Sequence, residues 1–453
     1  MPIRQRLQKI VSASLPRCTL VSLTNRELLF LLFCCVSSFL IQLYFLYKAS
    51  PPWNTFFEHG LMAIWLAGGK GFVIEESSFF SWAGPSAYRA PLYVAYLAFL
   101  MKYLGLSADH YLFAYYIHIV ITSLFCFPVY RIAKHIFSPA VAAISVLVLI
   151  TDYFVITQNF RLLPEVFLTG IMLVLLVNLY KIQVFQLRRY AAFSGFLFGV
   201  GALVKPVILT FLPVTLLWLC ALRSISLRKR LSCIGLLCTL AIVTVLPWTI
   251  RNYVVFNKFI PVDTSFGVNF WQGNNEKATG SLAANDGDST HWPTPAMEVE
   301  MRGMNEAERN EYLIGAGLTF IREHPFDFLV LRLKSLFYFW FTYNYWTHPH
   351  PAAFSFDFDL LYFEFSRYYL VLFNLLLIIG TYIAIRNRNE VFLIVGLALA
   401  FSALYSLTHA YSILRYCSPL HPALSVLVAS ALYEPYRRIV ERRREPPING
   451  MRQ

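Results

Sequence analysis

Ten stretches of this chain are strongly apolar and close to 20 residues long, and they restrict the fold more than any other feature of the sequence. An α-helix of about 20 apolar residues crosses the hydrocarbon core of a bilayer. Inside lipid every backbone polar group must be bonded within the protein, which a helix achieves locally. We therefore predict an all-α polytopic membrane protein with about ten transmembrane helices. The predicted spans are residues 27–47, 110–132, 139–157, 163–181, 190–207, 209–224, 231–249, 367–386, 390–409 and 419–437.

The placement of the charged residues supports this interpretation and orients the chain. Only 14% of the residues are charged, whereas a typical soluble domain has about 25%. A net charge of +13 is also found in nucleic-acid-binding proteins, but here Lys and Arg cluster before the first span and after every second span. Cytoplasmic loops carry such an excess, so we predict that both termini are cytoplasmic and that no nucleic acid is bound. The clusters lie at residues 4–26, 131–134, 181–189, 223–230, 386–388 and 437–444.

This orientation leaves two long segments outside the cytoplasm, residues 48–109 and 250–366. Long structured loops on one face usually carry function. We predict three parts: an N-terminal transmembrane module at 1–249 that includes the catalytic first outer loop, an outer loop at 250–366, and C-terminal helices with a basic cytoplasmic tail at 367–453. The predicted location is the inner or plasma membrane, with the functional site on the extracytoplasmic side.

Some apolar stretches of the outer segments do not suit a membrane span. Residues 91–104 would form a helix about 21 Å long, which is too short for a hydrocarbon core of about 30 Å. Residues 327–345 are rich in aromatics but carry Arg332 and Lys334. We predict that both, and residues 57–69, are interfacial helices, because aromatic and long basic side chains are favoured there. The outer loop also contains a small soluble-facing segment, residues 272–325.

Carboxylates, cations and amides gather at the outer ends of the predicted spans. Ionisable groups close to the hydrocarbon are costly and usually mark a substrate path. Arg and Lys suit a phosphate leaving group, and a carboxylate suits a general base that deprotonates an acceptor. Nucleotide sugars are made in the cytosol, so a sugar-transferring enzyme with an outer site needs a lipid-linked donor. The candidates are Glu58, Arg89, Glu165, Lys205, Arg251, Asn252, Asn274, Asn275 and Arg415.

Several strings along the chain carry a family resemblance. They include "EHGLMAIWLAGGKGF", "GPSAYRAPLYVAYLAFLMKYLG", "LLPEVFLTGIML", "GFLFGVGALVKPVIL", "LPWTIRNYVVFNKFIPV" with "FWQGNN", and "RYCSPLHP". In this order the strings resemble the integral-membrane glycosyltransferases of the GT-C fold class, in the branch of protein mannosyltransferase-like and aminoarabinose-transferase-like enzymes. The resemblance covers about residues 27–425. It implies a polyprenyl-phosphate-linked sugar as donor and inverting transfer by a single displacement to an acceptor on the extracytoplasmic face.

The resemblance also implies roles for individual residues. Glu58 matches the catalytic acid of the first outer loop, although the family's usual aspartate position falls near Thr55, and Glu165 matches a second acidic position. Arg89, Lys205 and Arg415 match basic positions that bind the donor phosphate. Arg251 and Asn252 match a "PWTIRNY" segment and, with Asn274 and Asn275, are predicted to bind substrate.

Alternatives remain at this point. A polytopic transporter or flippase for a lipid-linked saccharide would also be a membrane bundle, and a non-catalytic assembly or lipid-binding protein would not need the carboxylate. Glu58 could simply stabilise a helix start, and Arg89 could be a snorkelling anchor. The cysteines show no metal-ligand spacing, so no metal site is predicted. No cofactor is identified. A divalent metal is left open, although the lack of a clear DxD motif puts metal dependence in doubt. The sugar, which could be a hexose or a pentose, and the acceptor, whether lipid, glycan or protein, are not identified.

Overall fold

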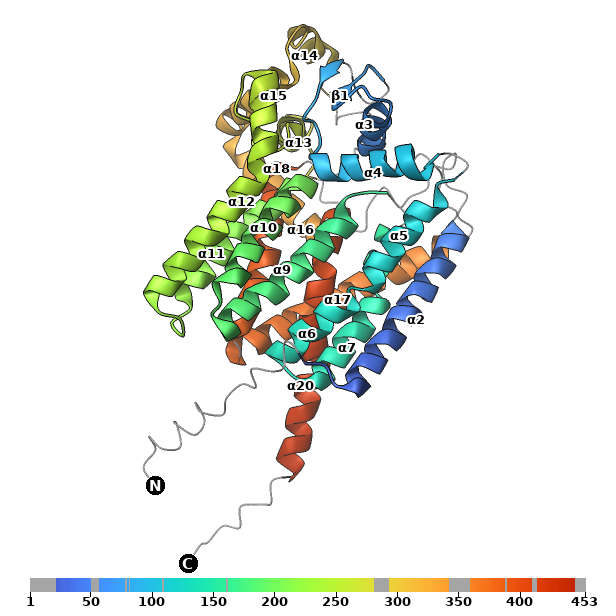
Figure 1. Ribbon diagram of the computed structural model, residues 1–453, viewed down its shortest axis with the longest axis vertical. Helices are drawn as coiled ribbons and strands as arrows, with labels where there is room; N and C mark the ends of the chain where they lie inside the picture. The colour runs from blue at the N-terminus through green and yellow to red at the C-terminus, as the bar shows by residue number, and fades with distance from the viewer. Residues whose placement is uncertain are drawn as a thin grey trace, which may run out of the picture.

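The structure is a computed structural model of the chain, and it is almost entirely helical (Figure 1). It describes residues 22–49, 57–77, 80, 82–107, 110–159, 162–280, 293–341, 359–387, 389–409 and 414–444. The α-helices are α2 (Asn25–Ala49), α3 (Phe57–Ala67), α4 (Pro91–Leu104), α5 (Leu112–Ser123), α6 (Cys126–Ile136), α7 (Pro139–Ile150), α8 (Tyr153–Gln158), α9 (Glu165–Phe185), α10 (Arg188–Val204), α11 (Phe211–Ala221), α12 (Leu227–Phe256), α13 (Ser265–Gly273), α14 (Pro295–Glu300), α15 (Glu306–Glu323), α16 (Pro325–Phe341), α17 (Asp359–Asn387), α18 (Phe392–Thr408), α19 (Leu414–Cys417) and α20 (His421–Arg444). Short 3-10 helices are η1 (Pro206–Thr210), η3 (Asn389–Val391) and η4 (Ser418–Leu420), and the strands β1 (Val73–Ile74) and β2 (Gly84–Pro85) pair antiparallel.

Every predicted span coincides with one helix or with two consecutive helices. Five of these segments are long and apolar enough to cross a membrane. Three others, Pro139–Ile150, Pro206–Ala221 and Phe392–Thr408, are shorter apolar helices. The all-α membrane architecture is thus confirmed, whereas the count of ten spans stays a prediction. The five long segments are Asn25–Lys48, Leu112–Ile136, Glu165–Phe185, Leu227–Phe256 and Tyr368–Arg386.

The predicted span 139–157 is broken in the structure. Helix α7 ends at Ile150, and Asp152 then starts the short helix α8. The Asp152 carboxylate accepts hydrogen bonds from the backbone N–H groups of Phe154 (2.8 Å) and Val155 (3.1 Å). An N-cap of this kind satisfies the free N–H groups of a helix start, and it makes the chain turn instead of continuing as one helix.

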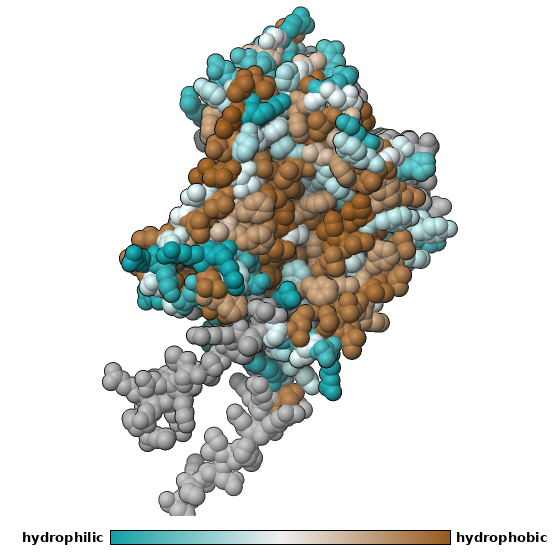
Figure 2. Space-filling model, viewed as in Figure 1, coloured by the Kyte–Doolittle hydropathy of each residue, from teal (hydrophilic) through white to brown (hydrophobic). Residues whose placement is uncertain are grey.

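The helices form a bundle with a smaller layer at one end. In Figure 1, α2 begins and α20 ends at the lower end of the bundle, and α3, α13, α14 and α15 gather at the upper end. Helix α4 runs across the bundle instead of along it, as expected for an interfacial helix. Figure 2 shows hydrophobic side chains over the bundle and hydrophilic ones at both ends. This pattern is the one expected for a bundle surrounded by lipid.

Helix α16 differs from its prediction in the position of its arginine. Instead of reaching toward an interface, Arg332 is buried and donates hydrogen bonds to the carbonyls of Ser406 (2.8 Å) and Gly273 (2.5 Å). A buried cation needs such acceptors. The side chain therefore connects α16 to the ends of α18 and α13, rather than snorkelling to water.

Close packing of α10 against α12 depends on two glycines spaced four residues apart, Gly195 and Gly199. A Cβ atom on Gly195 would lie 2.2 Å from the carbonyl oxygen of Leu237, and one on Gly199 would lie 2.4 Å from the Cβ of Thr244. Membrane helices commonly use such small residues to let their backbones approach. The pair thus fixes how close α10 comes to α12.

We expect Gly195→Ala to lower the thermal unfolding midpoint of the purified protein, because the added methyl group must push the two backbones apart. Overpacking of this kind costs about 1–3 kcal/mol. Gly235→Ala on α12 is the matched control, since a Cβ there has nothing within 4 Å. Equal unfolding midpoints for the two variants in the same detergent would contradict the close approach.

Candidate functional site

An ion pair joins the two predicted residues of the first outer loop. Glu58 lies in the first turn of α3, where the helix dipole favours a negative charge. Arg89 lies two residues before α4, and its Nη2 is 3.1 Å from the Oε1 of Glu58. The side chains are 16% and 22% exposed, respectively, so both remain within reach of a ligand. The guanidinium carbon of Arg89 is 4.7 Å from the centroid of the Tyr88 ring.

The electrostatic surroundings keep Arg89 cationic. Burial disfavours its charge, but the combined attraction of Glu58, Asp263 and nearby tyrosines outweighs burial and raises the pKa of Arg89 above its ordinary value. A permanently charged, planar guanidinium binds phosphate oxygens in a bidentate manner. The geometry is thus compatible with an anion at this position.

A second ion pair joins Glu165 and Lys205. Glu165 is the first residue of α9, and Lys205 follows the last residue of α10. The Lys205 Nζ is 2.7 Å from the Oε1 of Glu165, which is only 3% exposed. Lys205 Nζ also lies 4.8 Å from the centroid of the Tyr416 ring, and Tyr416 interacts electrostatically with Arg89. Lys205 thus packs on Tyr416, and Tyr416 is also within electrostatic range of Arg89.

Asp263 is an acidic residue near this site that the sequence reasoning missed. It lies between α12 and α13 and accepts a hydrogen bond from Ser265 Oγ (3.2 Å). Burial raises the pKa of Asp263 to about 6, although the nearby Arg89 acts in the opposite direction. A carboxylate that titrates near pH 6 is suited to accept a proton at neutral pH. Its sequence position next to "IPV" gave no sign that it would interact with Arg89.

The predicted substrate-binding residues Arg251 and Asn252 hold loops together in the structure. Arg251 donates to the carbonyls of Ser86 (2.8 Å) and Phe72 (3.1 Å), which flank the β1–β2 pair. Asn252 has no exposed surface, and its amide donates to the carbonyl of Ile260 (3.1 Å). These contacts fix the segment that leads into Arg89. The guanidinium and the amide used here are the groups that we predicted to bind substrate.

Asn274 and Asn275 have a similar local role at the end of α13. The amide of Asn274 donates to the carbonyl of Phe270 (2.7 Å), and that of Asn275 donates to the carbonyl of Trp271 (2.9 Å). Asn274 is fully buried. Both side chains thus bond carbonyl groups in the last turn of α13.

Two predicted positions lie outside what the structure describes. Arg415 falls within α19, but its side chain is outside the described residues. Thr55, the family's usual aspartate position, is also outside them. The roles that the resemblance implied for these positions stay predictions.

A further buried carboxylate, Glu306, positions the chain next to Arg89. Its Oε1 accepts hydrogen bonds from the backbone N–H of Ala87 (2.8 Å) and from Thr264 Oγ1 (2.6 Å), and its Oε2 accepts one from Ser86 Oγ (2.7 Å). Burial raises the pKa of Glu306, while these hydrogen bonds act against the rise. Glu306, the first residue of α15, thereby holds the segment 250–366 against the first outer loop, 48–109.

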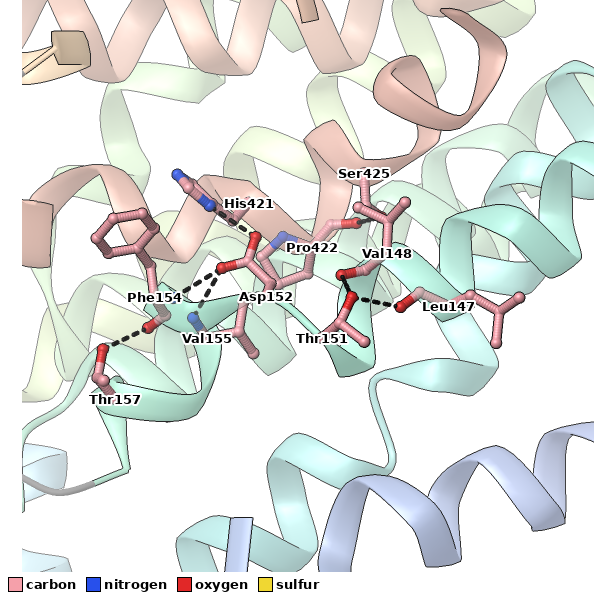
Figure 3. Close-up of polar contacts among 10 residues, drawn as sticks. All are labelled: Leu147, Val148, Thr151, Asp152, Phe154, Val155, Thr157, His421, Pro422 and Ser425. Atoms are coloured by element: carbon pink, nitrogen blue, oxygen red, sulfur yellow. Dashed lines mark hydrogen bonds and ion pairs between the residues drawn. The ribbon is translucent and has the colours of Figure 1, made fainter. Parts of the chain in front are cut away.

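Asp152 and His421 form a separate buried pair, shown in Figure 3. The Nδ1 of His421 lies 2.8 Å from the Oδ2 of Asp152, and both side chains are almost completely shielded from solvent. The imidazole ring also stacks on Phe373, with ring centroids 4.4 Å apart. The pair joins the beginning of α8 to the beginning of α20, so its evident role is structural.

A metal site has no ligand set in the described part of the chain. Among the described residues, no group of three or more His, Cys, Asp or Glu side chains is arranged to hold a metal ion. Structural and catalytic metal sites usually need three or more such ligands. No step proposed below uses a metal.

Comparisons with known proteins agree with this architecture. Residues 89–248 match the family described as dolichyl-phosphate-mannose-protein mannosyltransferase. A search of curated protein sequences gives no match. Among solved structures, the chain is similar to the oligosaccharyltransferase AglB of Archaeoglobus fulgidus in complex with an inhibitory peptide and a dolichol-phosphate, with a TM-score of 0.50 and 13% identity.

That similarity covers 94% of this chain but 52% of the oligosaccharyltransferase, so the chain spans about half the length of that protein. A lower similarity links it to ArnT of Cupriavidus metallidurans bound to undecaprenyl phosphate, with a TM-score of 0.41, 13% identity, and coverage of 94% of this chain and 82% of ArnT. The helical architecture, the apolar spans and the oligosaccharyltransferase similarity together show that this chain is an integral membrane protein with the GT-C fold.

Proposed function

We propose that the chain is a membrane glycosyltransferase that moves a sugar from a polyprenyl-phosphate donor to an acceptor outside the cytoplasm. The observation that carries the proposal is the pairing of Glu58 with Arg89 at 3.1 Å, supported by the Lys205–Glu165 pair, whose neighbour Tyr416 lies within electrostatic range of Arg89. The two pairs supply a carboxylate that can deprotonate the acceptor and cations that can bind the donor phosphate. The match to the mannosyltransferase family and the dolichol-phosphate bound by AglB support the donor class.

In the proposed reaction, the acceptor hydroxyl oxygen attacks the anomeric carbon of the donor. The bond between that carbon and the phosphate oxygen breaks, and the phosphate leaves with the electron pair. Glu58 takes the hydroxyl proton as general base. A single displacement of this kind inverts the configuration of the anomeric carbon.

The cations stabilise the negative charge that develops on the leaving phosphate. Arg89 and Lys205, together with the predicted Arg415, would contact the lipid phosphate, and preorganised cations of this kind act most strongly where charge appears. Glu165 holds Lys205 in place. Arg251 and Asn252, whose contacts fix the loop before Arg89, are assigned to positioning this cation rather than to substrate contact.

The proposal places this site on the extracytoplasmic side, with both termini in the cytoplasm. We expect a membrane-impermeant maleimide to label Glu276→Cys in intact cells, because residue 276 is exposed and belongs to the predicted outer loop. Arg228→Cys, in a predicted cytoplasmic basic cluster, is the matched control and should react only after lysis. The reverse labelling pattern would invert the proposed topology.

The test of the activity is sugar transfer by the purified protein in proteoliposomes. The wild-type protein should transfer radiolabelled hexose or pentose from at least one polyprenyl-phosphate sugar to an added glycan, lipid or peptide acceptor. If no donor of a broad panel is used while a fluorescent lipid-linked saccharide crosses the bilayer, the alternative of a flippase replaces the proposal.

A further inference from the structure

A cavity lies in the outer layer of the molecule, away from the transmembrane helices. Its volume is about 260 Å³, and its walls come from the first outer loop, from the α12–α13 connection and from α14 and α15. Small-molecule sites usually occupy about 300–1,000 Å³, so this cavity has room for one small ring rather than a long chain. In Figure 1 these elements form the upper end of the structure, near β1, α14 and α15.

One wall of the cavity is aromatic. Phe80, Trp82 and Tyr88 line it, and their ring centroids are 5.2–6.0 Å apart in edge-to-face pairs. Such packing fixes the ring orientations. The wall therefore presents a rigid apolar surface to whatever occupies the cavity.

The other wall carries fixed polar groups. Arg309 is only 8% exposed, and its Nη1 lies 3.1 Å from the Oε2 of Glu298. The same guanidinium lies 5.1 Å from the centroid of the Trp82 ring. The Arg309–Glu298 ion pair therefore holds two charged side chains in place at this wall.

The cavity adjoins the proposed reaction site through a single aromatic ring. Tyr88 lines the cavity, and the guanidinium of the next residue, Arg89, lies 4.7 Å from the centroid of the same ring. Glu306 also lines the cavity and bonds the backbone N–H of Ala87. An occupant of the cavity would thus be held beside the Glu58–Arg89 pair.

We propose that this cavity binds one saccharide ring of the acceptor, so that the molecule receiving the sugar is itself a glycan. This inference rests on the proposed function, and it narrows the acceptor class. A pyranose or furanose ring has an apolar C–H face, which suits the aromatic wall, and hydroxyl groups at its edge, which suit Arg309 and Glu298. Sites that combine an apolar lining with a few fixed polar groups are typical of such recognition.

The charges of the lining argue against other occupants. Glu298 and Glu306 set two carboxylates against the single guanidinium of Arg309, so a phosphate group would meet net repulsion. A lipid chain would place apolar groups against the charged Arg309–Glu298 pair, which disfavours it. A peptide in extended conformation would need a longer groove with backbone partners.

The proposal can be tested by binding, without any transfer of sugar. Saturation-transfer difference NMR on the full-length protein in lipid nanodiscs, with a panel of methyl hexopyranosides and pentopyranosides, should show contact to the ring protons. We expect Trp82→Leu and Arg309→Lys to weaken binding at least tenfold. Arg302→Lys is the matched control on an exposed arginine of the same segment, and its binding should equal that of the wild type.

Three other results overturn the inference, and a fourth overturns only the proposed function. Saccharide binding that is unaffected in Trp82→Leu and Arg309→Lys variants with wild-type unfolding midpoints would place the sugar elsewhere. Binding of a serine- and threonine-containing peptide, but of no glycoside, would make the acceptor a peptide. If the protein transfers sugar in proteoliposomes but binds no glycoside, this inference fails and the proposed function stands. If it binds glycosides through these residues but transfers no sugar, the proposed function fails and the saccharide site stands.

Discussion

Glu58→Gln is expected to abolish most sugar transfer while the donor still binds. The amide keeps the size of the carboxylate but cannot accept the proton of the acceptor hydroxyl, and general base catalysis contributes about 10²–10⁴-fold to a rate. The turnover number should fall by that factor, with little change in the donor concentration that gives half-maximal rate. Proteoliposome assays with a radiolabelled polyprenyl-phosphate sugar measure both quantities.

The control for this substitution is Glu75→Gln. Glu75 is an exposed acid of the same loop, paired with Lys70, and its variant should transfer sugar at the wild-type rate. Asp263 is the alternative general base, since it is the second carboxylate near Arg89. Normal turnover by Glu58→Gln together with loss of turnover by Asp263→Asn would assign the base to Asp263.

Lys205→Met is expected to destabilise the protein and to prevent donor binding. The substitution removes the cation that lies 2.7 Å from Glu165, whose side chain is only 3% exposed. Leaving a buried charge without its partner costs about 3–5 kcal/mol. The thermal unfolding midpoint in detergent should therefore drop clearly, and binding of a polyprenyl phosphate should be lost.

The double variant Lys205→Met, Glu165→Gln separates the two effects. It removes both charges, so the unfolding midpoint should return toward the wild-type value, whereas donor binding should stay lost. Lys258→Met serves as the control because Lys258 pairs with Glu311 on the exposed surface, where ion pairs contribute little. Recovery of donor binding in the double variant would limit Lys205 to a structural role.

The helices could be predicted from the sequence because their signals are local. A long apolar run specifies a membrane helix wherever it occurs, whereas the side of the membrane on which each connection lies stays a prediction from the basic clusters. The break at Asp152 was missed because it depends on one side chain that caps a new helix turn. The burial of Arg332 was missed because its acceptors, the carbonyls of Ser406 and Gly273, are far away in the sequence.

The candidate site could be predicted only as separate residues. Nothing in the spacing pairs Glu58 with Arg89, which are 31 residues apart, or Glu165 with Lys205, which are 40 apart. Arg251 illustrates the converse case. A cation at the end of a span indicates a substrate path, yet its guanidinium bonds the carbonyl of Phe72, 179 residues away. Only the fold shows which hydrogen-bond donors are already bonded to protein carbonyls.

The hydrogen bonds of Glu306 set an order of events during synthesis. This carboxylate joins the first outer loop at Ser86 to a helix that begins 220 residues later in the chain. A nascent chain that has emerged only as far as α12 contains Glu58, Arg89, Glu165 and Lys205, but it lacks the group that fixes Ser86 and Ala87. The proposed site is therefore completed only after residue 306 has been synthesised, and a ribosome-bound intermediate of this length carries these four charges without their final arrangement.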